Sequence, residues 1–197
     1  MRASTRREFI AGPAGRIECA VDAAEGTPRG AAVLAHPHPL YGGTLDNKVV
    51  QTLARACVEA GYEAWRPNFR GIGESEGRYD EGRGEVSDLA AVAAATGERP
   101  LVLAGFSFGA AMAARLAAQR KSEALILVGP AVTSFEVPAP QVDCLVIHGE
   151  VDETIPLGAV LDWARPQDQA VLVVPGADHF FHKRLKVIRD MVRRWLG

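Results

Sequence analysis

Short, nearly all apolar runs recur along the chain, separated by segments in which apolar residues return every three or four positions. Strands buried on both faces of a parallel sheet need such runs. Two early runs, residues 7–11 and 16–21, flank Gly12-Pro13-Ala14-Gly15 and predict an opening β-hairpin. The strands predicted after it lie at residues 31–35, 63–68, 101–106, 124–128, 144–148 and 170–174.

Between these strands the apolar period changes to that of an amphipathic helix. For the first helix, either Thr44 or Asp46 could cap the N-terminus, and Gly61 would end it. A second helix is predicted to end near Gly97. The apolar face of the first consists of Val49, Val50, Leu53, Ala54, Cys57 and Val58, and that of the second of Val86, Leu89, Ala90 and Ala93.

A last amphipathic helix is predicted near the C-terminus. Its apolar positions follow a four-three-four-three spacing and are Phe181, Leu185, Ile188, Val192 and Trp195. Basic residues lie elsewhere around this helix, and we interpret them as a solvated face: Lys183, Arg184, Lys186, Arg189 and Arg193.

The alternation of strands and helices predicts an α/β fold: an open, doubly wound, mostly parallel sheet with helices on both faces and an N-terminal hairpin. We expect residues 1–197 to form a single domain, because 197 residues are too few for two. Ligands of such sheets bind beyond the carboxyl ends of the strands, so we expect the functional site there.

Charge and hydropathy exclude two classes of partner. Lys plus Arg number 22 against 24 for Asp plus Glu, a net charge of −2, so no overall positive field attracts nucleic acid. The longest uncharged stretch, residues 100–114, is too short to span a bilayer, so no membrane partner is expected. A small molecule is the expected partner, and the oligomeric state cannot be inferred.

The cysteines favour a reducing, cytoplasmic location. Cys19, Cys57 and Cys144 are odd in number, lack metal-ligand spacing and lie in apolar segments, where a buried free thiol is usual. Thr5-Arg6-Arg7-Glu8-Phe9-Ile10 resembles a twin-arginine export signal, but polar and charged residues interrupt the segment behind it. We interpret this stretch as a surface strand that carries two arginines.

Ser107 is the candidate nucleophile. It lies in Gly105-Phe106-Ser107-Phe108-Gly109, between an apolar strand and a strong helix former, which is the context that a Gly-x-Ser-x-Gly turn requires. So tight a turn predicts a strained serine backbone, while Gly105 and Gly109 leave room for neighbouring elements. The N–H of Phe108, at the helix N-terminus, is suited to stabilise an oxyanion.

A serine hydroxyl needs a base at neutral pH, and His179 is the best placed of the five histidines. It follows the last predicted strand and the turn Pro175-Gly176-Ala177. The base needs an acid to orient it, and Asp152, on the loop after another strand, is the preferred candidate. Three other carboxylates are alternatives for this acid because they lie close by in sequence, namely Glu150, Glu153 and Asp178. Of these, Asp178 is expected to shape the turn.

A second oxyanion donor is expected from the loop after an earlier strand. In His36-Pro37-His38-Pro39-Leu40 the prolines have no N–H, so the available donors are His36, His38 and Leu40. His38 is the preferred one.

In this order the motifs resemble the α/β-hydrolase superfamily, in particular its small capless bacterial members related to dienelactone hydrolases and to esterases. The matching segments are His36-Pro37-His38-Pro39 with Gly42-Gly43-Thr44-Leu45-Asp46-Asn47, Asn68-Phe69-Arg70-Gly71-Ile72-Gly73-Glu74-Ser75-Glu76-Gly77, Gly105-Phe106-Ser107-Phe108-Gly109, His148-Gly149 with Asp152, and Gly176-Ala177-Asp178-His179.

The resemblance implies a serine hydrolase that needs no cofactor. It assigns Ser107 as nucleophile, Asp152 as acid, His179 as base, and the amides of Phe108 and His38 as the oxyanion hole. Related dienelactone hydrolases carry Cys at the nucleophile position, so the serine indicates the esterase-like branch. The chain departs from its relatives at Pro37, where a Gly would follow the first loop histidine.

The expected substrates are small soluble carboxylic esters or thioesters. Many superfamily members insert a lid where this chain has only the Pro-rich interval 129–143, which has no room for a helical cap. The site should therefore be open and lack a cover for a long acyl tail. Tyr41, Phe106 and Phe180 are candidate substrate-binding residues, although core packing would equally explain aromatic residues at these positions.

Two other functions are considered. A metal-dependent hydrolase could use the His36/His38 and His179/His182 pairs with Asp178 as a carboxylate ligand, but the serine turn would then be unexplained. A non-catalytic binding domain on a hydrolase scaffold is the other, because fold alone does not establish function.

Overall fold

The apolar runs form one eight-stranded sheet in the computed structural model, which describes residues 5–197. The strands are β1 (Thr5–Gly12), β2 (Gly15–Asp22), β3 (Gly30–Ala35), β4 (Tyr62–Pro67), β5 (Leu101–Phe106), β6 (Ala124–Val128), β7 (Asp143–Gly149) and β8 (Val171–Val174). Their order across the sheet is β1-β2-β4-β3-β5-β6-β7-β8. The β1–β2 hairpin is antiparallel and joins β4 in antiparallel register, while β4, β3 and β5 to β8 are parallel.

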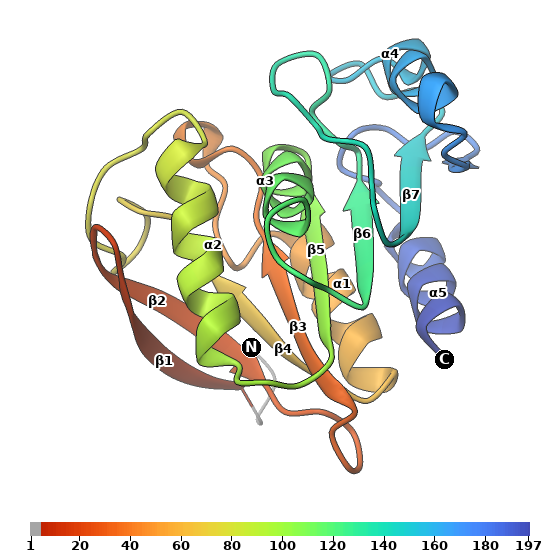
Figure 1. The fold of residues 1–197 in the computed structure, drawn as a ribbon. Coiled ribbons are helices and arrows are strands. Elements are labelled where there is room, and N and C mark those ends of the chain that lie inside the picture. Colours follow the sequence, from red (N-terminus) through yellow and green to blue (C-terminus); the bar gives the residue numbers. More distant parts are fainter. Residues whose placement is uncertain (1–4) are drawn as a thin grey trace.

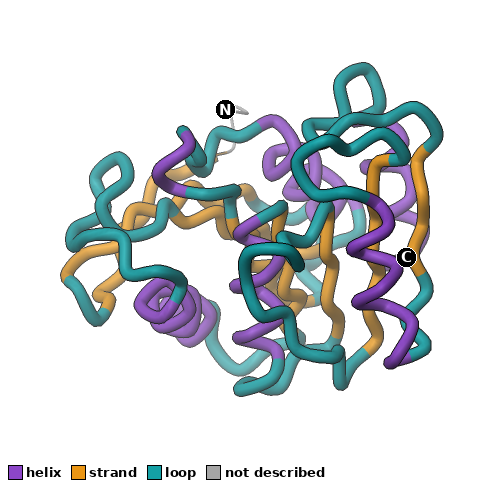
Figure 2. Tube along the Cα trace, turned by 90° about the horizontal axis from the view of Figure 1, so that it is seen from above, coloured by secondary structure: helices purple, strands orange, loops and turns teal. Residues whose placement is uncertain are grey.

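Helices cover both faces of this sheet, as the alternating pattern predicted. They are α1 (Lys48–Glu59), α2 (Arg83–Ala95), α3 (Phe108–Ala117), α4 (Leu157–Ala164) and α5 (Leu185–Leu196), with short 3-10 turns at Pro39–Tyr41 and Arg165–Gln167. Figure 1 shows α2 and α3 in front of the strands and α1 behind them, and Figure 2 shows helices on both sides of the sheet from above. The fold class expected from the sequence is confirmed.

Strand alternation divides the interior into two cores. Ala31 and Val33 of β3 point into the core under α2, α3 and α4, while Ala32 and Leu34 point into the core under α1 and α5. Successive side chains of a strand face opposite sides of the sheet, so an uninterrupted apolar run is what this two-sided burial requires. The sheet is thereby fixed in register between two helical layers.

The N-terminal cap of α1 is Asn47, so the expectation of Thr44 or Asp46 is wrong. The side-chain oxygen of Asn47 accepts hydrogen bonds from the N–H groups of Val49 at 2.9 Å and Val50 at 3.3 Å. Thr44 and Asp46 have other partners, since the Thr44 hydroxyl accepts from the Asp46 amide and the Asp46 carboxylate accepts from Gln51.

The last helix begins at Leu185, four residues later than Phe181, the first position of the predicted face. Phe181 is buried but lies in a turn with a φ of 53°, and its amide donates to the backbone oxygen of Asp178. At the other end, Trp195 is 37% exposed, and Leu196 occupies the buried position instead. Helix α4 was not among the helices predicted from the sequence.

Among residues 5–197 no helix has both the length and the apolar character needed to cross a membrane.

Candidate active site

The turn between β5 and α3 holds Ser107 in a strained backbone conformation. Its φ is 57° and its ψ is −118°, a region that side-chain-bearing residues rarely adopt. The surrounding structure maintains this conformation, since the Ser107 amide donates to the Val128 carbonyl of β6 at 2.9 Å. The strained turn predicted from the sequence is therefore present, and the serine is 8% exposed.

Two glycines make this turn sterically possible. A Cβ on Gly105 would collide with the backbone of Gly109, and a Cβ on Gly109 would collide with the carbonyl oxygen of Ala35 at the end of β3. The turn thus lies directly against β3 and the loop that follows it. Any larger residue at either position would push these backbones apart.

His179 and Asp152 meet Ser107 at the carboxyl end of the sheet. His179 Nε2 lies 3.1 Å from the Ser107 oxygen Oγ, and His179 Nδ1 lies 2.7 Å from Asp152 Oδ2. The three residues follow β8, β7 and β5 respectively, and the carboxyl ends of these parallel strands share one edge. The structure therefore joins the three predicted residues in one hydrogen-bonded chain.

The second carboxylate oxygen of Asp152 is fixed by the backbone. Asp152 Oδ1 accepts from the amides of Thr154 at 2.9 Å and Ile155 at 2.8 Å. Burial acts to raise the pKa of this carboxyl, but hydrogen bonds from His179 and Ile155 outweigh it and bring the pKa below its ordinary value. Asp152 is thus kept as an anion aimed at the imidazole.

His148 is a further buried histidine beside Asp152, and the sequence analysis gave it no role of its own. Its Nε2 lies 2.9 Å from the Ile155 carbonyl and 3.6 Å from Asp152 Oδ2. Burial lowers the pKa of His148, so it is neutral and donates to the carbonyl. It braces the loop that presents Asp152.

The rival carboxylates have other roles. Glu150 accepts from the amide of Gly176 at 2.8 Å, and Glu153 is exposed. Asp178 Oδ1 accepts from the backbone amide of His182 at 3.0 Å, and Asp178 Oδ2 lies 2.6 Å from the His182 ring. Asp178 therefore shapes the turn, as expected.

The loop after β3 contains two histidines in different environments. His36 is fully buried, its Nδ1 lies 2.6 Å from the Pro37 carbonyl, and its Nε2 accepts from the Phe69 amide at 3.0 Å. Burial lowers the pKa of His36 to about 4. His36 is consequently a neutral structural residue that ties this loop to the end of β4.

His38 lies at the centre of an aromatic cluster beside the serine turn. Its Nδ1 accepts from the Leu40 amide at 3.3 Å, and its Nε2 lies 3.1 Å from the Tyr79 hydroxyl. Its ring centroid is 5.0 Å from that of Phe108 and 5.9 Å from that of Phe135. The Leu40 amide already donates to the His38 imidazole. The backbone amides of His36 and His38 therefore remain as the candidates for the second oxyanion donor.

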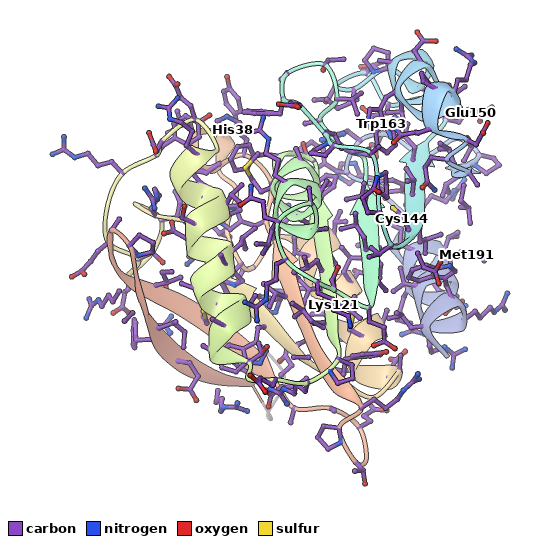
Figure 3. All side chains as sticks on the ribbon, in the orientation of Figure 1. His38, Lys121, Cys144, Glu150, Trp163 and Met191 are labelled. Atoms are coloured by element: carbon purple, nitrogen blue, oxygen red, sulfur yellow. The ribbon has the colours of Figure 1, made fainter. Side chains whose placement is uncertain are left out.

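Tyr79 and Phe135 of this cluster were missed by the sequence analysis. Both lie in irregular segments, where no apolar period marks a residue that faces a site. Figure 3 shows His38 at the same end of the sheet as Glu150, with Lys121 at the opposite end. The cluster therefore stands at the carboxyl-end edge, where the site was expected.

The three candidate substrate-binding residues differ in exposure. Phe106 is fully buried beneath the His179 ring, at a centroid distance of 4.9 Å. Tyr41 is 86% exposed and lies 4.7 Å from His38, and Phe180 is 50% exposed and lies 5.2 Å from His179. Tyr41 and Phe180 are thus the two that are open to solvent, while Phe106 is a core residue.

The histidine pairs considered for a metal are engaged elsewhere. Both ring nitrogens of His36 have backbone partners, and His179 bridges Ser107 and Asp152. Within the described part of the chain, no three His, Cys, Asp or Glu side chains are grouped so that they could hold a metal ion. The donor set therefore does not fit a metal centre.

Residues 27–146 match a family model described as serine aminopeptidase, S33. Among curated proteins, the "Uncharacterized protein RP471" of Rickettsia prowazekii (strain Madrid E) is 32% identical over 209 residues. That alignment covers 95% of this chain and 87% of the rickettsial protein.

Solved structures with the same fold include two described as serine hydrolases. An alpha-beta serine hydrolase homologue from Coxiella burnetii is 39% identical, with a TM-score of 0.91, and the match covers 98% of this chain and 97% of that one. An α/β serine hydrolase without lid from Xanthomonas campestris is 36% identical, also with a TM-score of 0.91, and the match covers 100% and 97% of the two chains.

Proposed function

Because this chain belongs to the family described as serine aminopeptidase, S33, within the α/β-hydrolase superfamily, we propose that it cleaves carboxylic ester or thioester bonds of small substrates through an acyl-enzyme. The observation that carries the proposal is the hydrogen-bonded chain from Ser107 through His179 to Asp152. Such a chain activates a serine whose hydroxyl is otherwise a poor nucleophile.

In the acylation step the Ser107 oxygen attacks the acyl carbonyl carbon while its proton moves to His179 Nε2. A tetrahedral oxyanion results, and the Asp152 carboxylate stabilises the imidazolium that has formed. The carbon–oxygen or carbon–sulfur bond of the substrate then breaks. His179 returns the proton to the leaving alcohol or thiol, and the acyl group remains on Ser107.

Backbone amides stabilise the oxyanion in this proposal. As the first residue of α3, Phe108 has an N–H without an acceptor inside the helix, at the positive end of the helix dipole. The backbone amide of His38 supplies the second donor, from the loop that lies against the serine turn. The contact between the His38 and Phe108 rings, 5.0 Å apart, keeps these two elements together.

Deacylation repeats the same steps with water. A water molecule transfers a proton to His179 as it attacks the acyl carbon, and the collapse of the second oxyanion releases the acid. The proton on His179 passes to the Ser107 oxygen. The site is thereby restored without a redox partner or cofactor.

The free thiols support a reducing location, and we propose the cytoplasm. Cys19 and Cys57 are buried, Cys144 is partly buried, and all three are unpaired. Burial raises the pKa of each thiol to about 12. The thiols are therefore protonated and poorly reactive.

Labelling with a fluorophosphonate tests the serine mechanism. We expect the wild-type protein to be labelled and to hydrolyse 4-nitrophenyl acetate, and Ser107→Ala to lose both, with turnover at least about 10⁴-fold lower. Ser87→Ala, a change on α2 away from the site, is the matched control and should behave as wild type. Turnover that survives in a folded Ser107→Ala variant would refute the proposal.

A further inference from the structure

A groove with a basic lining runs between α1 and α5, which pack against each other under one face of the sheet. It consists of two adjoining cavities of about 310 and 510 Å³ that share Lys48 and Leu185. Five cationic side chains line one or both of the cavities: Lys48, Arg55, Lys183, Lys186 and Arg189. Three of these belong to the basic set that the sequence suggested to be a solvated face.

The positive charge of this groove is only partly balanced. Among residues 5–197 no carboxylate lines either cavity, but three lie beside lining residues: Asp190 pairs with Lys186, Glu59 lies 3.8 Å from Arg189, and Asp178 lies 2.6 Å from the His182 ring. Lys48, Arg55 and Lys183 have no carboxylate within 4.0 Å among residues 5–197. The groove therefore carries surplus positive charge that is available to a ligand.

The N-terminus of α1 also lines the second cavity. Asn47, Lys48 and Val49 line it, and these residues are the cap and first turn of the helix. The positive end of the helix dipole adds to the field of the lysines at this point.

The same cavity opens beside the candidate catalytic base. Phe180 lines it, and the Phe180 ring is 5.2 Å from that of His179 and 6.0 Å from that of Phe106. In the proposed mechanism the leaving-group oxygen or sulfur must lie within hydrogen-bond reach of His179 Nε2 to receive its proton. A group held beside Phe180 is near the residue that protonates the leaving group, and the proposal below assigns the groove to that side of the scissile bond.

We propose that this groove binds a phosphorylated leaving group, so that the enzyme favours acyl esters or thioesters whose alcohol or thiol part carries phosphate. The inference rests on the proposed acyl-hydrolase function and adds its substrate class. Several cations around one groove suit a multiply charged anion better than a single carboxylate.

Two thioesters with the same acetyl group test this proposal, namely acetyl-coenzyme A, which carries phosphates, and the neutral S-acetyl-N-acetylcysteamine. The readout is the ratio of their kcat/KM values. We expect wild-type kcat/KM for acetyl-coenzyme A to exceed that for S-acetyl-N-acetylcysteamine about tenfold or more, and this ratio to fall as salt is added. In the double variant Lys48→Glu, Lys183→Glu the ratio should fall to about one.

The double variant Arg193→Glu, Arg194→Glu is the matched control. It also reverses two charges, on exposed residues of α5 about 10 to 12 Å along the helix from Lys186 and outside both cavities, and should keep the wild-type ratio. A thermal melt confirms that each variant is folded, and Arg55→Glu replaces the Lys48→Glu, Lys183→Glu variant if that one is not.

The groove proposal is overturned if wild-type enzyme hydrolyses both thioesters equally well, or if folded charge-reversed variants keep the preference. Failure of the underlying function gives a different result. In that case the wild-type enzyme hydrolyses neither the thioesters nor 4-nitrophenyl acetate, or hydrolysis persists in Ser107→Ala.

Discussion

At the scale of single residues, Ser107 holds a conformation that costs stability. Its φ of 57° lies in a region that glycine enters freely, and such strain costs about 1–3 kcal/mol. We expect Ser107→Gly to be inactive yet more stable than Ser107→Ala by about 1 kcal/mol, because only glycine relieves the strain. Urea denaturation of both variants measures this difference, and equal stabilities would show that the turn is unstrained.

His36 makes stability sensitive to acid. Burial lowers its pKa to about 4 in the folded protein, whereas an unfolded histidine has a pKa near 6.5, so the unfolded state binds more protons between these values. The contribution of His36 is complete above pH 6.5 and is lost as the pH falls toward 4. The expected loss of unfolding free energy is about 3 kcal/mol, since one pKa unit corresponds to about 1.4 kcal/mol.

Denaturation midpoints at pH 7.0, 6.0, 5.0 and 4.5 measure this loss. His36→Gln should flatten the dependence, while the exposed His182→Gln serves as control and should retain it. His148, whose pKa burial also lowers, adds a dependence of the same sign. An unchanged slope in His36→Gln would contradict the assignment.

The residues that meet at the site could be predicted because topology alone brings them together. Ser107, Asp152 and His179 each follow a parallel strand, and such strands end at one edge of the sheet. Their catalytic roles remain predictions. Tyr79 and Phe135 could not be predicted, because tertiary contacts rather than local pattern place them against His38.

At the scale of secondary-structure elements, Asn47 determines where α1 begins. Its side chain satisfies two amides of the first turn, and losing such a cap costs about 1 kcal/mol. We expect Asn47→Ala to lower the free energy of unfolding by about that amount, and Asn47→Asp to restore it because a carboxylate also accepts these bonds. Calorimetry of the three proteins checks this, and an equal loss in both variants would rule out the cap.

The element boundaries show where sequence patterns stop being informative. The central strands β3, β5 and β6 were predicted closely because burial on both faces leaves nearly every position apolar. The start of α5 was placed too early because Phe181 is buried at helical spacing, although its backbone has a positive φ. Similarly, Thr44, Asp46 and Asn47 are all able to cap a helix, and only the tertiary arrangement selects among them.

At the scale of the whole molecule, the segment between β6 and β7 leaves the site without a helical cover. Residues 129–142 form no helix. They are fixed to the rest of the protein, since Val137 is buried and its carbonyl accepts a hydrogen bond from the Trp163 indole at 2.8 Å. Arg115 binds the neighbouring Glu136 carbonyl at 2.9 Å. This segment is anchored to α3 and α4. It forms no helical cap, as its short, Pro-rich sequence predicted.

Chain-length preference follows from this anchoring. Each methylene that an enzyme buries contributes about 0.8 kcal/mol, or about fourfold in kcat/KM, but a long tail finds no cover here. We therefore expect 4-nitrophenyl acetate and butyrate to be hydrolysed at least as efficiently as the decanoate, measured below the micelle concentration of the ester. A steady rise in kcat/KM with every added methylene would refute the open-site interpretation.

The anchored segment also affects the fate of the acyl-enzyme. Enzymes that close over their substrates expel water and can hand an acyl group to another acceptor. In this protein residues 129–142 form no helix over Ser107 and are fixed by Arg115 and Trp163, so we expect water to reach an acylated serine once the leaving group departs. An added alcohol would have to compete with the solvent itself. The free acid should therefore dominate the products even when a second nucleophile is abundant.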